Sequence, residues 1–220
     1  CVERLFEAAF PFMVQGTDCG LRLADACELL PIAEAQAEVA FIESGVDPML
    51  RDREGFLKRV ARRIEQGRVF VVFDGDKLVF KADIIAETSE VAYLEGVFVG
   101  EEYRGKGIGP KCLSALTVEL LSRVANVCLL SNVDFGSAHR SFEKAGFRRI
   151  FSMTGRPGPG VRTANKASRQ LRDGRSNPST LTRSVVLSEA LNVRSACASG
   201  TYFTQTTMFI SRHVLFPCAG

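Results

Sequence analysis

The sequence predicts an α/β (α+β) fold: a mixed, mostly antiparallel sheet flanked by helices. Strand-like and helical runs follow one another in the order β-α-α-β-β-β-loop-α-β-α-β from about residue 20 to residue 152. Consecutive strands are joined by short turns, which only antiparallel neighbours allow. The chain of 220 residues is 46% hydrophobic and 24% charged, so it can bury one full core.

The first elements are a short strand at Leu21–Leu23 and two helices. In the first helix, apolar residues keep helical spacing between residues 32 and 42, although Pro31 indicates that the regular part begins late. The second helix lies in "DREGFLKRVARRIEQGR". Asp52 suits its cap, an apolar stripe follows, and Gly67 ends it.

Three antiparallel strands come next, at Val69–Phe73, in "LVFKADIIAE" after the turn "DGDK", and at Val91–Val99 after the turn "TSE". The pattern changes at "GEEYRGKGIGPK". A helix in "GPKCLSALTVELLSRV", a buried strand "NVCLLSN", a helix "SAHRSFEKAG" and a last strand "FRRIFSM" then follow. Helices are therefore expected on both faces of the sheet.

Charge and composition divide the chain. Residues 1–153 hold 19 basic and 23 acidic residues, whereas residues 154–220 hold 9 and 2. We expect an N-terminal extension at 1–19, the folded domain at 20–153 and a low-complexity, disordered tail at 154–220, which is rich in Gly, Pro, Ser, Thr and Arg. A basic arm for nucleic acid is the alternative, but the net charge of +3 is small and a solvated tail is favoured.

Several other classes are not supported. No apolar run reaches the roughly 18 residues of a membrane span, and the N-terminus carries acids where a signal peptide is basic. We therefore expect a soluble, cytoplasmic protein without a membrane or nucleic-acid partner. The seven cysteines are scattered without a CxxC pair, which favours free thiols over disulfides or a zinc site, and we expect no metal.

The run Gly100–Lys111 half-matches three phosphate-binding loops. As a nucleotide P-loop it has Gly107 where the magnesium-binding Ser or Thr belongs, and as a dinucleotide fingerprint it has Pro110 in place of the third glycine. What remains is Arg104-x-x-Gly107-x-Gly109 between a strand and a helix. There, backbone N–H groups and the helix dipole attract a pyrophosphate, with a plain tight turn as the alternative.

This loop resembles the acyl-CoA-binding motif of the GNAT superfamily of N-acetyltransferases, R/Q-x-x-G-x-G/A after the fourth strand. "LEGVFVGEEYRGKGIGPKCL" is similar to the family's strand-loop-helix motif, and "AHRSFEKAGFRRI" to its second motif, A-x-x-x-Y-E-K-x-G-F. The resemblance implies acetyl-CoA as cosubstrate and direct acetyl transfer to a primary amine of a small molecule or peptide. It implies these cofactor-binding residues: Val97, Phe98, Val99, Arg104, Gly105, Lys106, Gly107, Ile108, Gly109, Asn132 and Phe142.

Acetyl transfer needs a deprotonated amine, a polarised thioester carbonyl and a proton for the thiolate. The resemblance implies that backbone N–H groups of a splayed strand, residues 96–99, polarise the carbonyl. Strand alternation places Tyr93, Glu95, Val97 and Val99 on one face. We expect Glu95 to be the general base and Tyr93 to help in proton transfer; the alternative is that Glu95 only lies in a solvated groove.

Two departures from the family pattern leave alternatives open. Phe142 stands at the position of the usual tyrosine proton donor, and Phe135 at that of a common asparagine, with Asn132 nearby. A CoA-binding regulatory or sensor module with little catalysis is therefore the second hypothesis. The other side chains weighed are Cys112, expected to be a packing residue, and His139, expected to be exposed.

The end of the sheet is a third departure. The family completes its sheet with a seventh strand hairpinned to the sixth, but no strand follows "FRRIFSM" for about thirty residues. "TYFTQTTMFI" could return to fill this place. The hypothesis we favour is that unrelated sequence replaces the last strand, which would leave an open edge that promotes a homodimer or aggregation.

Overall fold

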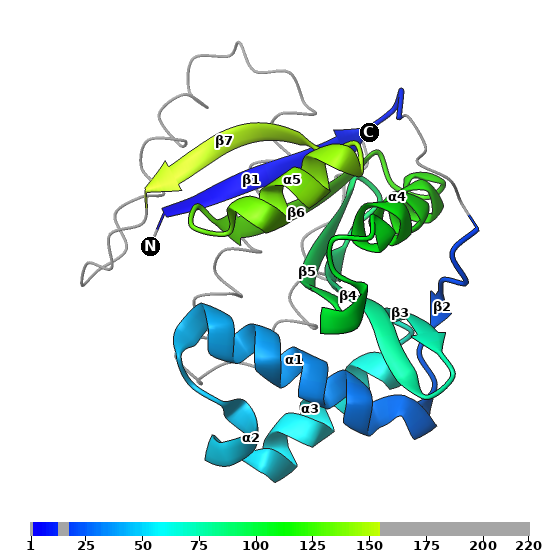
Figure 1. Cartoon of the computed structure of the whole chain (residues 1–220). Helices are drawn as coiled ribbons and strands as arrows, with labels where there is room; N and C mark the ends of the chain where they lie inside the picture. Colours follow the sequence, from blue (N-terminus) through cyan, green and yellow to red (C-terminus); the bar gives the residue numbers. More distant parts are fainter. Residues whose placement is uncertain (1, 13–17, 155–220) are drawn as a thin grey trace, which may run out of the picture. The chain divides into compact units, whose positions relative to one another are not determined.

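The computed structural model describes residues 2–12 and 18–154, with side chains from 3 to 12 and from 18 to 150. Of the tail expected at 154–220, Thr154 lies in the last strand, and the remainder, which includes the segment "TYFTQTTMFI", lies outside the described residues. The rest forms a sheet with helices on both of its faces (Figure 1).

Seven strands form one sheet in the order β2-β3-β4-β5-β6-β1-β7. Their bounds are β1 Val2–Ala9, β2 Arg22–Leu23, β3 Val69–Asp74, β4 Lys77–Glu87, β5 Val91–Val99, β6 Asn126–Asn132 and β7 Arg148–Thr154. All neighbours are antiparallel except β5 and β6, which are parallel. The predicted mixed, mostly antiparallel sheet is confirmed.

The strand β1 is the main difference from the sequence expectation, which left residues 1–19 outside the folded domain. Val2–Ala9 pairs with β6 on one side and with β7 on the other. Figure 1 shows this N-terminal strand, in blue, beside β7. Phe6 and Ala8 are buried in the larger core. The place next to the last predicted strand, which the family fills from the C-terminal side, is thus taken by the N-terminal segment.

The helices are α1 Leu29–Ser44, α2 Pro48–Arg51, α3 Arg53–Glu65, α4 Ile108–Leu121 and α5 Gly136–Lys144, with 3₁₀ turns at Ala26–Glu28 and Glu101–Tyr103. The start of α1 differs from the prediction, because Pro31 lies inside its first turn. Proline is tolerated there since the first N–H groups of a helix have no intrahelical acceptor. Asp52 caps α3 as predicted, accepting from the N–H of Gly55 at 2.9 Å.

Two hydrophobic cores lie on opposite faces of the sheet, and β3 shows why. Its residues alternate: Val69 and Val71 pack with α1 and α3, whereas Phe70 and Val72 pack in the core that holds the buried side chains of α4 and α5. The sheet therefore separates an α1/α3 face from an α4/α5 face (Figure 1).

Candidate active site

The alternation of side chains along β5 shifts by one residue at Gly96. On β4, Lys81 pairs with Phe98 and Asp83 pairs with Glu95, so one β4 residue, residue 82, stands opposite two residues of β5. This is a β-bulge. Gly96 has φ +60°, a conformation that residues with a side chain rarely adopt.

The bulge corrects one prediction. Tyr93, Glu95, Val97 and Val99 were expected on a single face, but the extra residue shifts the alternation by one. Val97 and Val99 pack against the core on the α4/α5 face, while Glu95 lies on the other face with its cross-strand partner Asp83. Sequence periodicity cannot show such a shift, although a glycine inside a strand is its usual marker.

The strands β5 and β6 separate just before the bulge. Their pairing covers only four residue pairs and ends at Leu94 and Leu129, although β5 continues to Val99 and β6 to Asn132. β6 stays paired with β1 over this stretch. The C-terminal half of β5 therefore leaves its parallel neighbour, which is the splayed arrangement that the resemblance implied.

The glycine loop joins the end of β5 to α4. Gly105 and Gly107 have φ +76° and +78°, and no atom lies within 4 Å of a side chain built at either position. Gly107 caps α4, which begins at Ile108. A side chain at Gly109 would come within 3.0 Å of Val99 Cγ2, so this glycine lets the helix approach the strand.

Arg104 and Lys106 flank these glycines. The Arg104 guanidinium donates from Nε to the carbonyl of Val99 at 2.9 Å and pairs with Glu38 of α1 at 2.8 Å, and it lies 5.7 Å from the Phe98 ring centre. The charge that was expected next to a phosphate is thus partly neutralised by Glu38. Lys106 lies 5.8 Å from the ring centre of Tyr103.

The two predicted catalytic residues lie together on β5. The hydroxyl of Tyr93 donates to Glu95 Oε1 at 2.7 Å. Tyr93 is 1% exposed, so its ring is fixed in the sheet, whereas Glu95 is half-buried. A carboxylate held at the bulge in this way can accept a proton from a group that approaches along the α1/α3 face.

A buried charged cluster next to this pair was not predicted. Lys81 and Asp83 are 0% and 2% exposed, with Lys81 Nζ 2.7 Å from Asp83 Oδ1. The other carboxylate oxygen of Asp83 accepts from Arg63 of α3 at 2.9 Å. Burial lowers the pKa of Lys81, and the neighbouring Asp83 opposes this effect. A signal was available: these are two charges on one face of the apolar run "LVFKADIIAE".

The second-motif residues are placed differently from the loop. Asn132 ends β6, and its side-chain oxygen accepts from the N–H of Asp134 at 3.1 Å. Phe142 is buried in the core, with its ring edge-on to Phe6 at 5.4 Å. His139 is also buried, at 4% exposure, which contradicts the expected exposed position.

Cys112 is fully buried in the core, as the packing interpretation predicted. Burial, with a smaller contribution from Cys19, raises the pKa of the Cys112 thiol to about 12. Its position in the first turn of α4 therefore does not make it a reactive thiolate.

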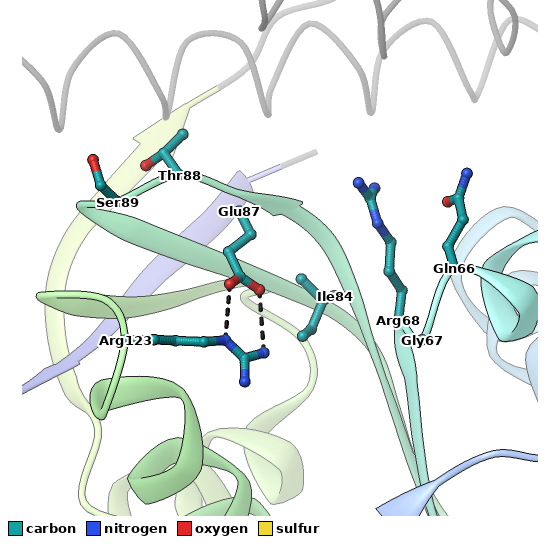
Figure 2. Close-up of a pocket in the computed structure, with 8 residues that line it drawn as sticks. All are labelled: Gln66, Gly67, Arg68, Ile84, Glu87, Thr88, Ser89 and Arg123. Carbon is teal, nitrogen blue, oxygen red and sulfur yellow. Dashed lines mark hydrogen bonds and ion pairs between the residues drawn. The ribbon is translucent and has the colours of Figure 1, made fainter.

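A surface pocket of about 570 Å³ lies away from this site. Figure 2 shows Glu87 and Arg123 paired on one side of it, and Arg68 and Gln66 on the other. It adjoins Ser89, just before β5, whereas the loop follows Val99 at the other end, about 26 Å along the strand at a rise of about 3.3 Å per residue. We therefore place the site at the bulge and the loop.

Within residues 2–12 and 18–154 no three His, Cys, Asp or Glu side chains are grouped so that they could hold a metal ion. None of the helices in this part of the chain is long and apolar enough to cross a membrane.

Residues 65–149 match the family model "Acetyltransferase (GNAT) domain". This range runs from the end of α3 into β7, so it contains the bulge, the splayed strands and the glycine loop. Acetyl-CoA is the acyl donor of this family. A comparison with curated proteins finds no match.

Solved structures share the fold at low identity. An acetyltransferase from the GNAT family of Colwellia psychrerythraea is 17% identical, with a TM-score of 0.55, over 67% of this chain and 52% of that one. A protein described as a possible acetyltransferase from Clostridium difficile 630 is also 17% identical, with a TM-score of 0.51, over 64% and 97%. A functionally unknown conserved protein from Staphylococcus epidermidis ATCC 12228 has 17% identity and a TM-score of 0.50, over 69% and 58%.

This chain thus spans only about half to three fifths of the length of the Colwellia and Staphylococcus proteins. The bulge, the splayed strands and the loop all fall within the matched range, and the solved structures agree in fold. Residues 65–149 are therefore similar to an acetyltransferase domain of the GNAT family, and the chain shares the fold of these solved structures.

Proposed function

We propose that this domain transfers the acetyl group of acetyl-CoA directly to a primary amine. The observation that carries the proposal is the bulge at Gly96, because it places two sets of groups on opposite faces of one strand. Val97 and Val99 face α4, on the side where the loop begins its helix, and Glu95 faces α1 and α3. A thioester at the bulge would be open to an amine from the α1/α3 face.

The loop is proposed to bind the pyrophosphate of CoA. Gly105 and Gly107 leave the space above the backbone clear, and the first N–H groups of α4 have no acceptor within the helix. Lys106 adds positive charge. Arg104 adds less, because Glu38 neutralises part of the charge of its guanidinium. We propose that the pantetheine follows Val97–Val99 along the splayed half of β5.

The chemistry needs little from side chains. Backbone N–H groups of the splayed strand would stabilise the negative charge that develops on the thioester oxygen. Glu95 would take a proton from the ammonium group of the acceptor, which frees the nitrogen lone pair for attack, with Tyr93 holding the carboxylate in place through the 2.7 Å hydrogen bond. The neutral amine nitrogen then bonds to the carbonyl carbon and the carbon–sulfur bond breaks. The nitrogen gives up its remaining extra proton to the leaving CoA thiolate through solvent, which yields the amide and CoA.

Titration calorimetry with acetyl-CoA and CoA, and ATP for comparison, tests the cofactor. Release of CoA thiol with a panel of primary amines then tests transfer. Glu95→Gln should lower kcat by roughly 100-fold or more, the usual contribution of a general base, without weakening acetyl-CoA binding. Glu90→Gln, an exposed glutamate just before β5, is the matched control and should have wild-type activity. Binding of ATP as tight as that of CoA would refute the assignment of the loop.

A second candidate is a CoA-binding sensor with little catalysis. Phe142 favours it, because the ring has no proton to give to the thiolate and is packed against Phe6. This candidate predicts saturable CoA binding without thiol release for any amine. Turnover that depends on Glu95 would exclude it.

A further inference from the structure

Lys81 is the buried charge closest to the bulge. Its ammonium faces three acceptors: Asp83 Oδ1 at 2.7 Å, Gln36 Oε1 at 2.6 Å and the carbonyl oxygen of Gly96 at 3.4 Å. The contacts with Gln36 and Gly96 are hydrogen bonds, and the contact with Asp83 is an ion pair. They come from α1, from β4 and from the bulge of β5 itself.

The contact with the bulge is direct. A side chain built at Gly96 would stand 2.6 Å from Gln36 Oε1 and 3.0 Å from Lys81 Nζ. The ammonium of Lys81 and the side-chain amide of Gln36 therefore pack directly against the Cα of Gly96. The cross-strand pairs of Lys81 with Phe98 and of Asp83 with Glu95 enclose the bulge on both sides.

The cluster extends to the helices of the α1/α3 face. Arg63 of α3 reaches the same carboxylate of Asp83 at 2.9 Å, and Gln36 belongs to α1. Around the ammonium stand two carboxylates, those of Asp83 and Glu95, and one further cation, Arg63. The position of the bulge is thus tied to α1 and α3 through one lysine.

Stability does not explain a charge at this place. Burying an ion pair costs about as much free energy as the pair returns, and an apolar residue of similar volume is often as good or better. A methionine would fill the space of Lys81, but it would leave the Gly96 carbonyl and the Gln36 oxygen without their donor.

We propose that Lys81 is a positioning residue for acetyl transfer: it holds the Gly96 bulge so that those backbone N–H groups of residues 97–99 that face away from β4 point at the thioester carbonyl. This rests on the proposed function. Lys81 touches neither cofactor nor acceptor in this scheme and acts through the backbone. Because a displacement of about 1 Å can cost about 100-fold in rate, a loosened bulge should weaken catalysis far more than cofactor binding.

Infrared difference spectroscopy of bound acetyl-CoA labelled with ¹³C at the carbonyl tests this without an acceptor. Hydrogen bonds to the carbonyl oxygen polarise it and lower its stretching frequency. In the wild type the frequency should fall on binding. In Lys81→Met the dissociation constant for acetyl-CoA should change less than about threefold, while most of the frequency shift is lost. Lys77→Met, on the same strand but with a side chain 63% exposed, should keep both.

The double variant Lys81→Met/Asp83→Leu removes both buried charges. If the single variant does not fold, the same infrared measurement on the double variant tests the role of Lys81. A folded double variant that binds acetyl-CoA and keeps the wild-type frequency would overturn the role of Lys81. So would a wild-type complex whose frequency equals that of free acetyl-CoA, or a loss of affinity above tenfold in the double variant. Failure of the wild type to bind acetyl-CoA would instead refute the proposed function.

Discussion

Phe6→Ala tests whether the N-terminal segment belongs to the domain. Phe6 is fully buried on β1, with its ring centre 5.4 Å from that of Phe142 and 5.1 Å from that of His139. Truncation of a buried phenylalanine costs about 3–5 kcal/mol of unfolding free energy. For a domain of this size that corresponds to a fall in melting temperature of roughly 6–20 °C, at about 2–4 °C per kcal/mol.

Urea denaturation followed by circular dichroism measures the change in unfolding free energy. Phe10→Ala is the matched control, because Phe10 lies just after β1 and is 66% exposed; its effect should stay within about 0.5 kcal/mol. The double variant Phe6→Ala/Phe142→Ala should show a coupling of about 0.5–1.5 kcal/mol for the two rings. A loss below about 1 kcal/mol for Phe6→Ala would mean that residues 1–19 are an extension after all.

Three further outcomes are expected. Gly107→Ala forces a side chain into φ +78° at a cost of about 1–2 kcal/mol, so calorimetry should show weaker acetyl-CoA binding. Burial, and then the Arg4 guanidinium, lower the pKa of His139 in the folded state. The unfolded chain therefore takes up this proton first, and the unfolding free energy should fall as the pH drops below about 6.5. His139→Gln should flatten that dependence in urea titrations between about pH 7.5 and 5.5, and an unchanged slope would contradict it. With a pKa of about 12, Cys112 should resist iodoacetamide in the folded protein while the exposed Cys27 reacts, as peptide mass mapping would show.

The sequence was sufficient for the elements that rest on local patterns. Hydrophobic periodicity, caps and turn residues act within a few positions, so α3, the hairpin of β3 and β4, and the glycine loop before α4 could be predicted. The place of β1 could not, because pairing with β6 and β7 joins residues more than 100 positions apart. The first residues show no strong alternation that would mark a strand.

The candidate site could also be predicted only in part. The glycines of the loop are read directly from the chain, since their role follows from backbone conformation. The extra residue in β5 determines on which face of the sheet Val97 lies, and strand alternation alone predicted the opposite face. The cluster around Lys81 needs α1, α3, β4 and β5 assembled, so its residues could be noticed as unusual but not connected.

The position of β1 also determines how the domain responds to a pulling force. Val2 pairs with Thr154, so the two outer ends of β1 and β7 lie at the same edge, and Glu7 pairs with Arg148 at the opposite end. A force applied between residues 2 and 154 would open the hydrogen bonds of this ladder one after another, as a zipper opens. A force between residues 9 and 154 would load all of them at once in shear, so the domain should be mechanically weak along one axis and strong along the other.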